Sequence, residues 1–226
     1  AVDTVSSHLL LETVGRIRQA VDRHIMGSGA VLEAAFPDGM PANPTIDADI
    51  DSLRTRFWIA TSLHTDPNNY VYYGNRYGQG LGLFRHSRTD GELRIKLRAE
   101  EMRTYYRFTG ISGALKFHSR ETRLFDPRTR PWYRAGETQT DQTWTSVYID
   151  FGTGDLVATR ARRVLGPNAE FEGVVATDVS LRALNDFVTN LRVSENGLAF
   201  IVEPNGDLIA SSSSPNVARA PDGTRI

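Results

Sequence analysis

The stretch LFDPRTRPWYRAG, residues 124–136, contains the signals that decide how this chain folds. Pro131 fixes its own φ at a value that suits the first turn of a helix, and it favours an extended backbone at Arg130 just before it. Trp132 and Tyr133 then lie on a short helix, WYRAGE, whose indole must be buried against another layer. We therefore predict a short aromatic helix packed on a sheet.

A second stretch, TWTSVYID, predicts a strand with two different faces. A period of two places Trp144, Ser146, Tyr148 and Asp150 on one face and Val147 and Ile149 on the other. The second face is apolar and fits a core. The first face combines an indole, a hydroxyl, a phenol and a carboxylate, which is a mixture better suited to binding than to packing.

One carboxylate lies in an otherwise apolar strand. Asp178 is set among Val174, Val175, Ala176 and Val179 in EGVVATDVSL, residues 172–181. A buried carboxylate is costly unless a positive group meets it. That group is either a nearby arginine, Arg128 or Arg130, or the ammonium group of a ligand. In the second case the arginine is free to bind a ligand carboxylate.

Composition excludes several classes of function. The chain has 226 residues, 23% of them charged, a net charge of -1 and no cysteine. It offers no basic surface for nucleic acid, no thiolate chemistry and no apolar run near the roughly 20 residues of a membrane span. The five histidines form no metal-ligand spacing, and neither HExxH nor GxSxG occurs. We expect no enzyme activity, no cofactor and no metal site in this chain, which begins inside a helical pattern without a signal peptide.

Periodicity predicts an α+β fold. Apolar residues recur at helical spacing over residues 5–32, and a second helix is expected at residues 46–63, with the acidic run TIDADID as helix N-terminal charge rather than a calcium loop. An antiparallel sheet of about five strands follows, including hairpins around GNRYGQGLG and at residues 152–154. From Ser180 a helix and the strands GLAFIV and DLIAS begin a second, incomplete sheet.

The motifs, taken in order, resemble a known family. FDPRTRPWYRAG, WTSVYID, EGVVATDVSLRALNDFV and NGLAFIVEPNGDLIAS are similar in order and spacing to the double Cache sensor module of bacterial transmembrane receptors. The resemblance implies a PAS-like fold in three parts. These are a long helix and connector at residues 1–45, a membrane-distal ligand-binding module at residues 46–179, and a connecting helix with an incomplete membrane-proximal module at residues 180–226.

The resemblance also implies a site. In the amino-acid-binding branch of the family, the ligand-contacting positions fall in this chain on Arg130, Trp132, Tyr133, Tyr148, Asp150 and Asp178. Phe125 stands where that branch has a tyrosine, and we interpret it as a packing residue. Arg128 is interpreted as a surface residue or part of a structural ion pair. The alternative for the charged and phenolic residues is an internal network of salt bridges and hydrogen bonds.

The same resemblance implies an extracytoplasmic sensor. Its ligand would be a small polar molecule, namely an amino acid, an amine or a carboxylate, bound in the periplasm by a receptor tethered to the inner membrane. The output domain would be a diguanylate cyclase, a histidine kinase or a chemotaxis transducer. We further expect a homodimer through the N-terminal helix. The alternative function is a module that binds no small molecule and acts through protein contacts or dimerisation.

Overall fold

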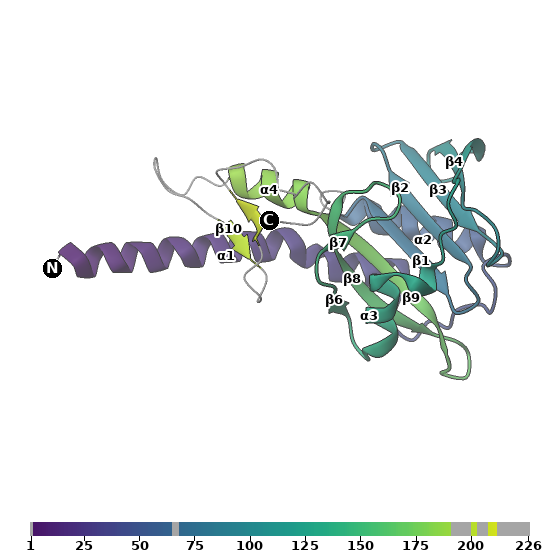
Figure 1. Cartoon of the computed structure of the whole chain (residues 1–226), viewed down its shortest axis with the longest axis horizontal. Coiled ribbons are helices and arrows are strands. Elements are labelled where there is room, and N and C mark those ends of the chain that lie inside the picture. Colours follow the sequence, from purple (N-terminus) through teal and green to yellow (C-terminus); the bar gives the residue numbers. More distant parts are fainter. Residues whose placement is uncertain (1, 65–67, 191–199, 203–207, 212–226) are drawn as a thin grey trace. The chain divides into compact units, whose positions relative to one another are not determined.

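The structure, a computed structural model, describes residues 2–64, 68–190, 200–202 and 208–211 (Figure 1). Its contacts divide the chain into two compact units. One is Gly27–Val179, and the other combines Ala1–Met26 with Ser180–Ile226. The sequence predicted three parts with different roles, divided after residues 45 and 179. Contacts alone do not test these roles, so this division stays a prediction.

Helix α1 covers Val2–Ala35, which confirms the helix predicted at residues 5–32. The C-terminal end of α1 belongs to the unit Gly27–Val179, and its side chains pack in the core of that unit. Val31, Leu32 and Ala35 have no exposed surface. These side chains lie at the i, i+1 and i+4 positions of one helical face, the spacing expected when a helix lies on a sheet.

Nine strands form the main sheet, where the sequence predicted about five. They are β1 (Tyr70–Asn75), β2 (Gly80–Arg85), β3 (Asp90–Lys96), β4 (Thr104–Thr109), β5 (Lys116–Arg120), β6 (Thr143–Trp144), β7 (Tyr148–Ile149), β8 (Leu156–Leu165) and β9 (Phe171–Ser180). Their order is β5-β4-β3-β2-β1-β9-β8-β6, and β7 also pairs with β8. The first and last segments of the sheet, β1 and β9, are thus central neighbours, and their pairing is antiparallel.

The single strand predicted at residues 144–150 is two short strands. β6 pairs with β8 through Thr143 and Trp144, and β7 pairs with it through Tyr148 and Ile149. The interpretation of Ile149 as core is wrong, because its side chain is 47% exposed. The predicted turn at residues 152–154 between β7 and β8 is confirmed.

One face of the sheet is covered by helices. Helix α2 (Ile50–Leu63) buries Leu53, Phe57 and Ala60 against it, and the end of α1 completes this core. From β1 the core receives Val71 and Tyr73, which alternate with residues of the opposite face. Figure 1 shows α2 behind the sheet in this view.

The opposite face of the sheet is covered by the segment LFDPRTRPWYRAG, residues 124–136. A 3-10 turn, η1 (Pro127–Thr129), leads into helix α3 (Pro131–Thr138), and α3 lies in front of the sheet in Figure 1. Trp132 and Tyr133 are buried there with Tyr70 and Tyr72 of β1. The short aromatic helix packed on a sheet is therefore confirmed, with Pro131 as its first residue.

In the other unit, α4 covers Leu181–Asn190, and the strands β10 (Phe200–Val202) and β11 (Leu208–Ser211) form an antiparallel pair. The helix and hairpin expected after residue 180 are thus present. Whether this sheet is incomplete depends on residues outside those described, and it stays a prediction. No helix in the described part of the chain has the length and apolar character that crossing a membrane requires.

Candidate functional site

The floor of the candidate site is built from aromatic side chains and glycines. Tyr70 and Tyr72 point to the same face of β1, and their tilted rings lie 4.6 Å apart between centroids. A Cβ on Gly74 would lie 2.9 Å from the Trp132 ring, and one on Gly82 would lie 2.7 Å from the Tyr70 hydroxyl. Glycine at these two positions therefore lets the indole and the phenol lie directly on the sheet.

The segment before α3 is fixed from both sides. Asp126 caps η1 by accepting a hydrogen bond of 3.0 Å from the backbone nitrogen of Arg128, and its carboxylate pairs with the Arg128 guanidinium at 2.9 Å. The buried Lys96 Nζ donates to the Phe125 carbonyl oxygen. Arg128 is thus an exposed residue in a structural ion pair, as predicted. These contacts set where Arg130 and Trp132 lie.

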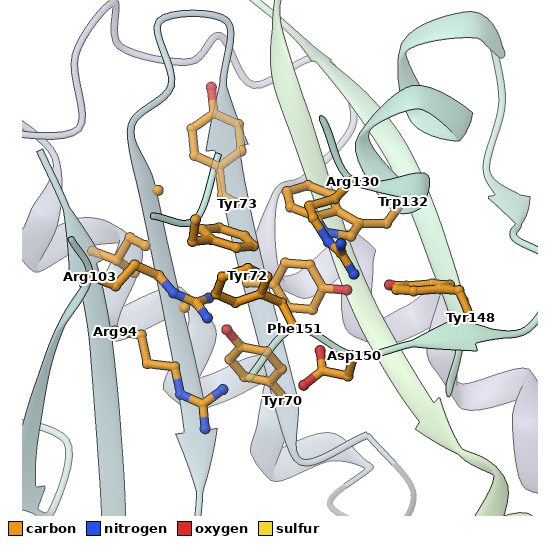
Figure 2. Close-up of a pocket in the computed structure, with 14 residues that line it drawn as sticks. Tyr70, Tyr72, Tyr73, Arg94, Arg103, Arg130, Trp132, Tyr148, Asp150 and Phe151 are labelled. Carbon is orange, nitrogen blue, oxygen red and sulfur yellow. The ribbon is translucent and has the colours of Figure 1, made fainter. Parts of the chain in front are cut away.

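A pocket opens between this segment, β1 to β4 and the β7–β8 turn. Its walls are formed by Tyr70, Tyr72, Tyr73, Gly80, Leu81, Gly82, Arg94, Arg103, Phe125, Arg130, Trp132, Tyr148, Asp150 and Phe151. Figure 2 shows Arg94 and Arg103 on the left wall and Arg130, Trp132 and Tyr148 on the right. The void at its centre measures about 20 Å³. Both charge signs and several hydroxyls therefore face one small space.

Asp178, on β9, lies beside the pocket and is held by hydroxyl groups. Its Oδ1 accepts hydrogen bonds from Tyr72 Oη at 2.5 Å and from Thr159 Oγ1 at 2.6 Å. Tyr148 Oη lies 2.6 Å from Thr159 Oγ1 and must be the donor there, because the single hydroxyl proton of Thr159 goes to Asp178. Oδ2 accepts no hydrogen bond from a described residue.

Neither arginine considered from the sequence pairs with Asp178. Arg128 pairs with Asp126, and Arg130 donates a hydrogen bond of 2.9 Å to the Ile149 carbonyl oxygen. Within the described residues Asp178 has no ion-pair partner. Burial, reinforced by the negative charge of Asp150, raises the pKa of Asp178 to about 7, although the hydroxyl donors oppose this change. Among the described residues this carboxylate thus has no ion-pair partner, although the charge of Arg94 also acts to lower its pKa.

Asp150 and Tyr148 complete the right wall. Asp150 Oδ2 accepts hydrogen bonds from the backbone nitrogens of Gly152 and Thr153 at 3.1 and 2.8 Å, so this carboxylate also shapes the β7–β8 turn. Burial raises the pKa of the Tyr148 hydroxyl, which keeps it a neutral donor. The guanidinium of Arg130 lies 5.7 Å from the Tyr148 ring centroid.

The structure brings four of the six predicted site residues into the pocket wall, and these are Arg130, Trp132, Tyr148 and Asp150. Asp178 contacts the wall through Tyr72. Tyr133 is buried against Trp132 and Phe171, at 5.8 and 5.9 Å between ring centroids, and does not line the pocket. Phe125 packs against Phe151 and also borders the pocket.

Five polar residues that line the pocket were not predicted from the sequence: Tyr70, Tyr72, Tyr73, Arg94 and Arg103. A signal was present, because YVYYGN places Tyr70 and Tyr72 two apart on one strand face. GELRIKLR similarly places Glu92, Arg94 and Lys96 on one face, and all three side chains are buried. Which charged strand face lines a pocket depends on strand order, which periodicity does not reveal.

A single antiparallel sheet with helices on one face and a polar pocket on the other is the architecture of a PAS-like sensor domain. Residues 83–186 match the family model described as methyl-accepting chemotaxis protein-like, first PDC sensor domain. The methyl-accepting chemotaxis protein McpC of Bacillus subtilis is 36% identical over 90 residues, which are 39% of this chain and 14% of that protein. The chain therefore spans a small part of such relatives.

Solved chemoreceptor domains share the fold. The ligand-binding domain of Campylobacter jejuni Tlp3, in complex with 4-methylisoleucine, has a TM-score of 0.63 and 16% identity, covering 92% of this chain and 70% of that one. The ligand-binding domain of Pseudomonas fluorescens CtaA, in complex with L-alanine, has a TM-score of 0.52 and 20% identity, covering 93% and 72%. Residues 83–186 are therefore similar to the first PDC sensor domain of methyl-accepting chemotaxis proteins, and the solved chemoreceptor ligand-binding domains share the fold of this chain.

Proposed function

We propose that the pocket binds a zwitterionic amino acid or a closely related small polar molecule. Asp150 and Asp178 would hold the ligand ammonium group, and Arg130 would hold the ligand carboxylate. Trp132 and Tyr148 would contact the rest of the molecule. Tyr133 would not contact the ligand and would instead hold the indole of Trp132 in position.

The observation that carries this proposal is the unpaired carboxylate of Asp178. A buried carboxylate stabilised only by neutral hydroxyls, with a second carboxylate near it, strongly favours the arrival of a cation. Arg130 supplies the complementary charge, since the only described hydrogen bond of its guanidinium is to a carbonyl oxygen and it has no described carboxylate partner. A ligand with one positive and one negative group satisfies both.

The size of the void adds a condition. About 20 Å³ is room for a single water, so an amino acid enters only if part of the wall moves outward. The β7–β8 turn is the part of the wall that can move while losing the fewest buried contacts, because Gly152, Thr153 and Gly154 are exposed. Asp150 is anchored in that turn, so closing the turn over a ligand would also deliver its carboxylate to the ammonium group.

In the whole receptor this domain would lie in the periplasm, tethered to the inner membrane, and would pass the signal to a cytoplasmic output domain. Its similarity to methyl-accepting chemotaxis proteins favours a chemotaxis transducer over a diguanylate cyclase or a histidine kinase. The domain itself would be a sensor rather than an enzyme.

The α1 helix supports a further part of the proposal, association of two copies. Six of its large apolar side chains are more than half exposed: Val5, Leu9, Leu10, Leu11, Val14 and Met26. Such a surface is unfavourable in water and would be covered by the same helix of a second copy. Sedimentation velocity of the chain, beside a variant with Leu10 and Val14 changed to serine, tests this. A monomer at high concentration for both proteins contradicts it.

The decisive experiment is calorimetric titration of the chain with analogues that remove one charged group at a time. L-alanine, propionate and ethylamine form one such set, and L-valine, isovalerate and isobutylamine form another. We expect measurable binding only for ligands with both groups, because losing either leaves a buried charge unpaired, at about 2 to 5 kcal/mol. If no member of a full amino-acid panel binds, the alternative of a ligand-free protein-interaction or dimerisation module is favoured instead.

A further inference from the structure

Two buried arginines face the pocket from the wall opposite Arg130. Arg94 lies on β3 and is 8% exposed, and Arg103 lies just before β4 and is 6% exposed. Both line the pocket, and in Figure 2 the guanidinium of Arg103 points toward Tyr72 while that of Arg94 lies beside Tyr70. The amino and carboxylate groups of an amino acid, bound as proposed, would engage neither of them.

The acidic partners of these arginines do not balance their charge. Glu92 lies 2.9 Å from Arg94 Nε and 2.8 Å from Arg107 Nε, so one carboxylate serves two guanidinium groups. Glu121 pairs with Arg103 through contacts of 2.9 and 2.5 Å, and its Oε1 also accepts a hydrogen bond of 2.5 Å from Tyr105 Oη. Three arginines thus share two glutamates. The cluster carries one positive charge in excess.

The excess charge is directed at the pocket. Arg94 uses Nε for Glu92, and its two terminal nitrogens donate no hydrogen bond to a described residue. A Cβ on Gly152 would lie 3.4 Å from Arg94 Nη1, 3.6 Å from Arg103 Nη2 and 3.5 Å from Tyr105 Oη. Tyr105 Oη already donates its proton to Glu121, so the donors that converge under the β7–β8 turn are the terminal nitrogens of Arg94 and Nη2 of Arg103. An anionic group placed there would accept hydrogen bonds from both guanidinium groups.

We infer that Arg94 and Arg103 form a second subsite, for the side-chain carboxylate of the ligand, so that the preferred ligand is an α-amino dicarboxylate. This inference rests on the proposed amino-acid site. The guanidinium carbons of Arg103 and Arg130 each lie 5.7 Å from the Phe151 ring centroid, so they are at most twice that distance apart. A short diacid held at each end by contacts of about 2.8 Å spans this range.

The first test compares acids with their amides on the unchanged chain. Titration calorimetry with L-glutamate against L-glutamine, and with L-aspartate against L-asparagine, varies one charge at nearly constant shape. We expect the diacid of at least one pair to bind ten times more tightly or better. Equal or tighter binding of the amide in both pairs overturns the inference.

The second test assigns the preference to a residue. Arg94→Gln should reduce the acid-to-amide ratio to within about twofold while leaving the affinity for the amide nearly unchanged, and Arg94→Lys should restore part of the ratio. Arg107→Gln is the matched control, because Arg107 contacts the same glutamate but does not line the pocket. If the control lowers the ratio as much as Arg94→Gln, the pair is not a contact subsite. Should Arg94→Gln not fold, Arg103→Gln and Arg94→Lys provide the same comparison.

Succinate and glutarate separate this inference from the proposed function. If the diacids bind and no amino acid does, the ammonium site fails while the arginine subsite survives. If amino acids bind and glutamate has no advantage over glutamine, only the inference fails.

Discussion

The phenol of Tyr72 on β1 donates a hydrogen bond of 2.5 Å to Oδ1 of Asp178 on β9, the neighbouring central strand. With Thr159 donating to the same oxygen, the carboxylate is positioned by neutral groups alone. Such an arrangement fixes where the carboxylate lies without neutralising it. The alternative of an internal salt bridge to Arg128 or Arg130 is therefore not what holds this strand pair together.

Replacing Asp178 with asparagine is expected to stabilise the unliganded chain at alkaline pH. The folded-state pKa of about 7 lies above the ordinary value of 3.8, so the contribution of Asp178 to stability is greatest below pH 4 and is lost as pH rises through 7. The ionised group thus costs up to about 4 kcal/mol at pH 8. Melting curves at pH 5 and pH 8 should show Asp178→Asn gaining several degrees over the unchanged chain at pH 8 and clearly less at pH 5, where only part of this cost is present.

Two other outcomes of the melting curves would contradict this role of Asp178. If Asp178→Asn lowers the melting temperature strongly at pH 8, the carboxylate has a stabilising cationic partner, as the internal-network alternative requires. A gain of equal size at pH 5 and pH 8 would mean that the group does not titrate between them.

Binding of an amino acid should strengthen as pH rises from 5 to 8. The ammonium group needs ionised Asp178, whose pKa of about 7 leaves it mostly protonated at pH 5, so binding there must first expel a proton. Affinity should rise nearly tenfold per pH unit below 7 and level off above it. Titrations in two buffers of different ionisation enthalpy, at pH 6, measure the proton released. Affinity independent of pH, or proton uptake, contradicts the assignment of Asp178.

Most of the fold could be predicted because its signals are local. Pro131 after an extended Arg130 predicted the start of α3, and the glycines around residue 153 predicted the β7–β8 turn. The strands missed or merged had weak local signals. β5 has five mostly exposed residues, and the break between β6 and β7 interrupts an alternation that continues in the sequence.

The site was predictable only in part, for a different reason. Arg130, Trp132 and Tyr148 lie in motifs whose residue types and resemblance indicated a pocket. Arg94 and Arg103 lie in strands that read as ordinary amphipathic segments, and their charges face the pocket only because β3 and β4 follow β2 on the same side of β1. That order is a long-range property of the sheet, which strand periodicity does not contain.

Gly74→Ala should destabilise the domain and weaken ligand binding together. The new Cβ would lie 2.6 Å from Pro127 Cβ and 2.9 Å from Trp132 Cη2, so the segment leading into α3 must shift, at about 1 to 3 kcal/mol. Gly80→Ala is the matched control for the melting temperature alone, since Gly80 also lines the pocket; its nearest neighbour would be an ordinary contact at 3.6 Å, and alanine favours a strand over glycine. Equal melting temperatures for the two variants would show that the close approach at Gly74 imposes no constraint.

Arg130→Ala should abolish most ligand affinity while changing stability little. Its described contacts are one hydrogen bond to the Ile149 carbonyl and the rings of Tyr148 and Phe151, and no described carboxylate depends on it. A ligand carboxylate left without its bidentate partner should lose about 2 to 5 kcal/mol, some 30-fold to several thousand-fold in affinity. Arg128→Ala is the control two residues away, since it removes an exposed ion pair worth at most about 1 kcal/mol. Calorimetric titration and a melting curve on both variants separate the outcomes. Because Arg130 and Arg128 carry the same charge on the same segment, equal losses of affinity would indicate a long-range electrostatic effect, and a large loss of stability with unchanged affinity in Arg130→Ala would remove this arginine from the site.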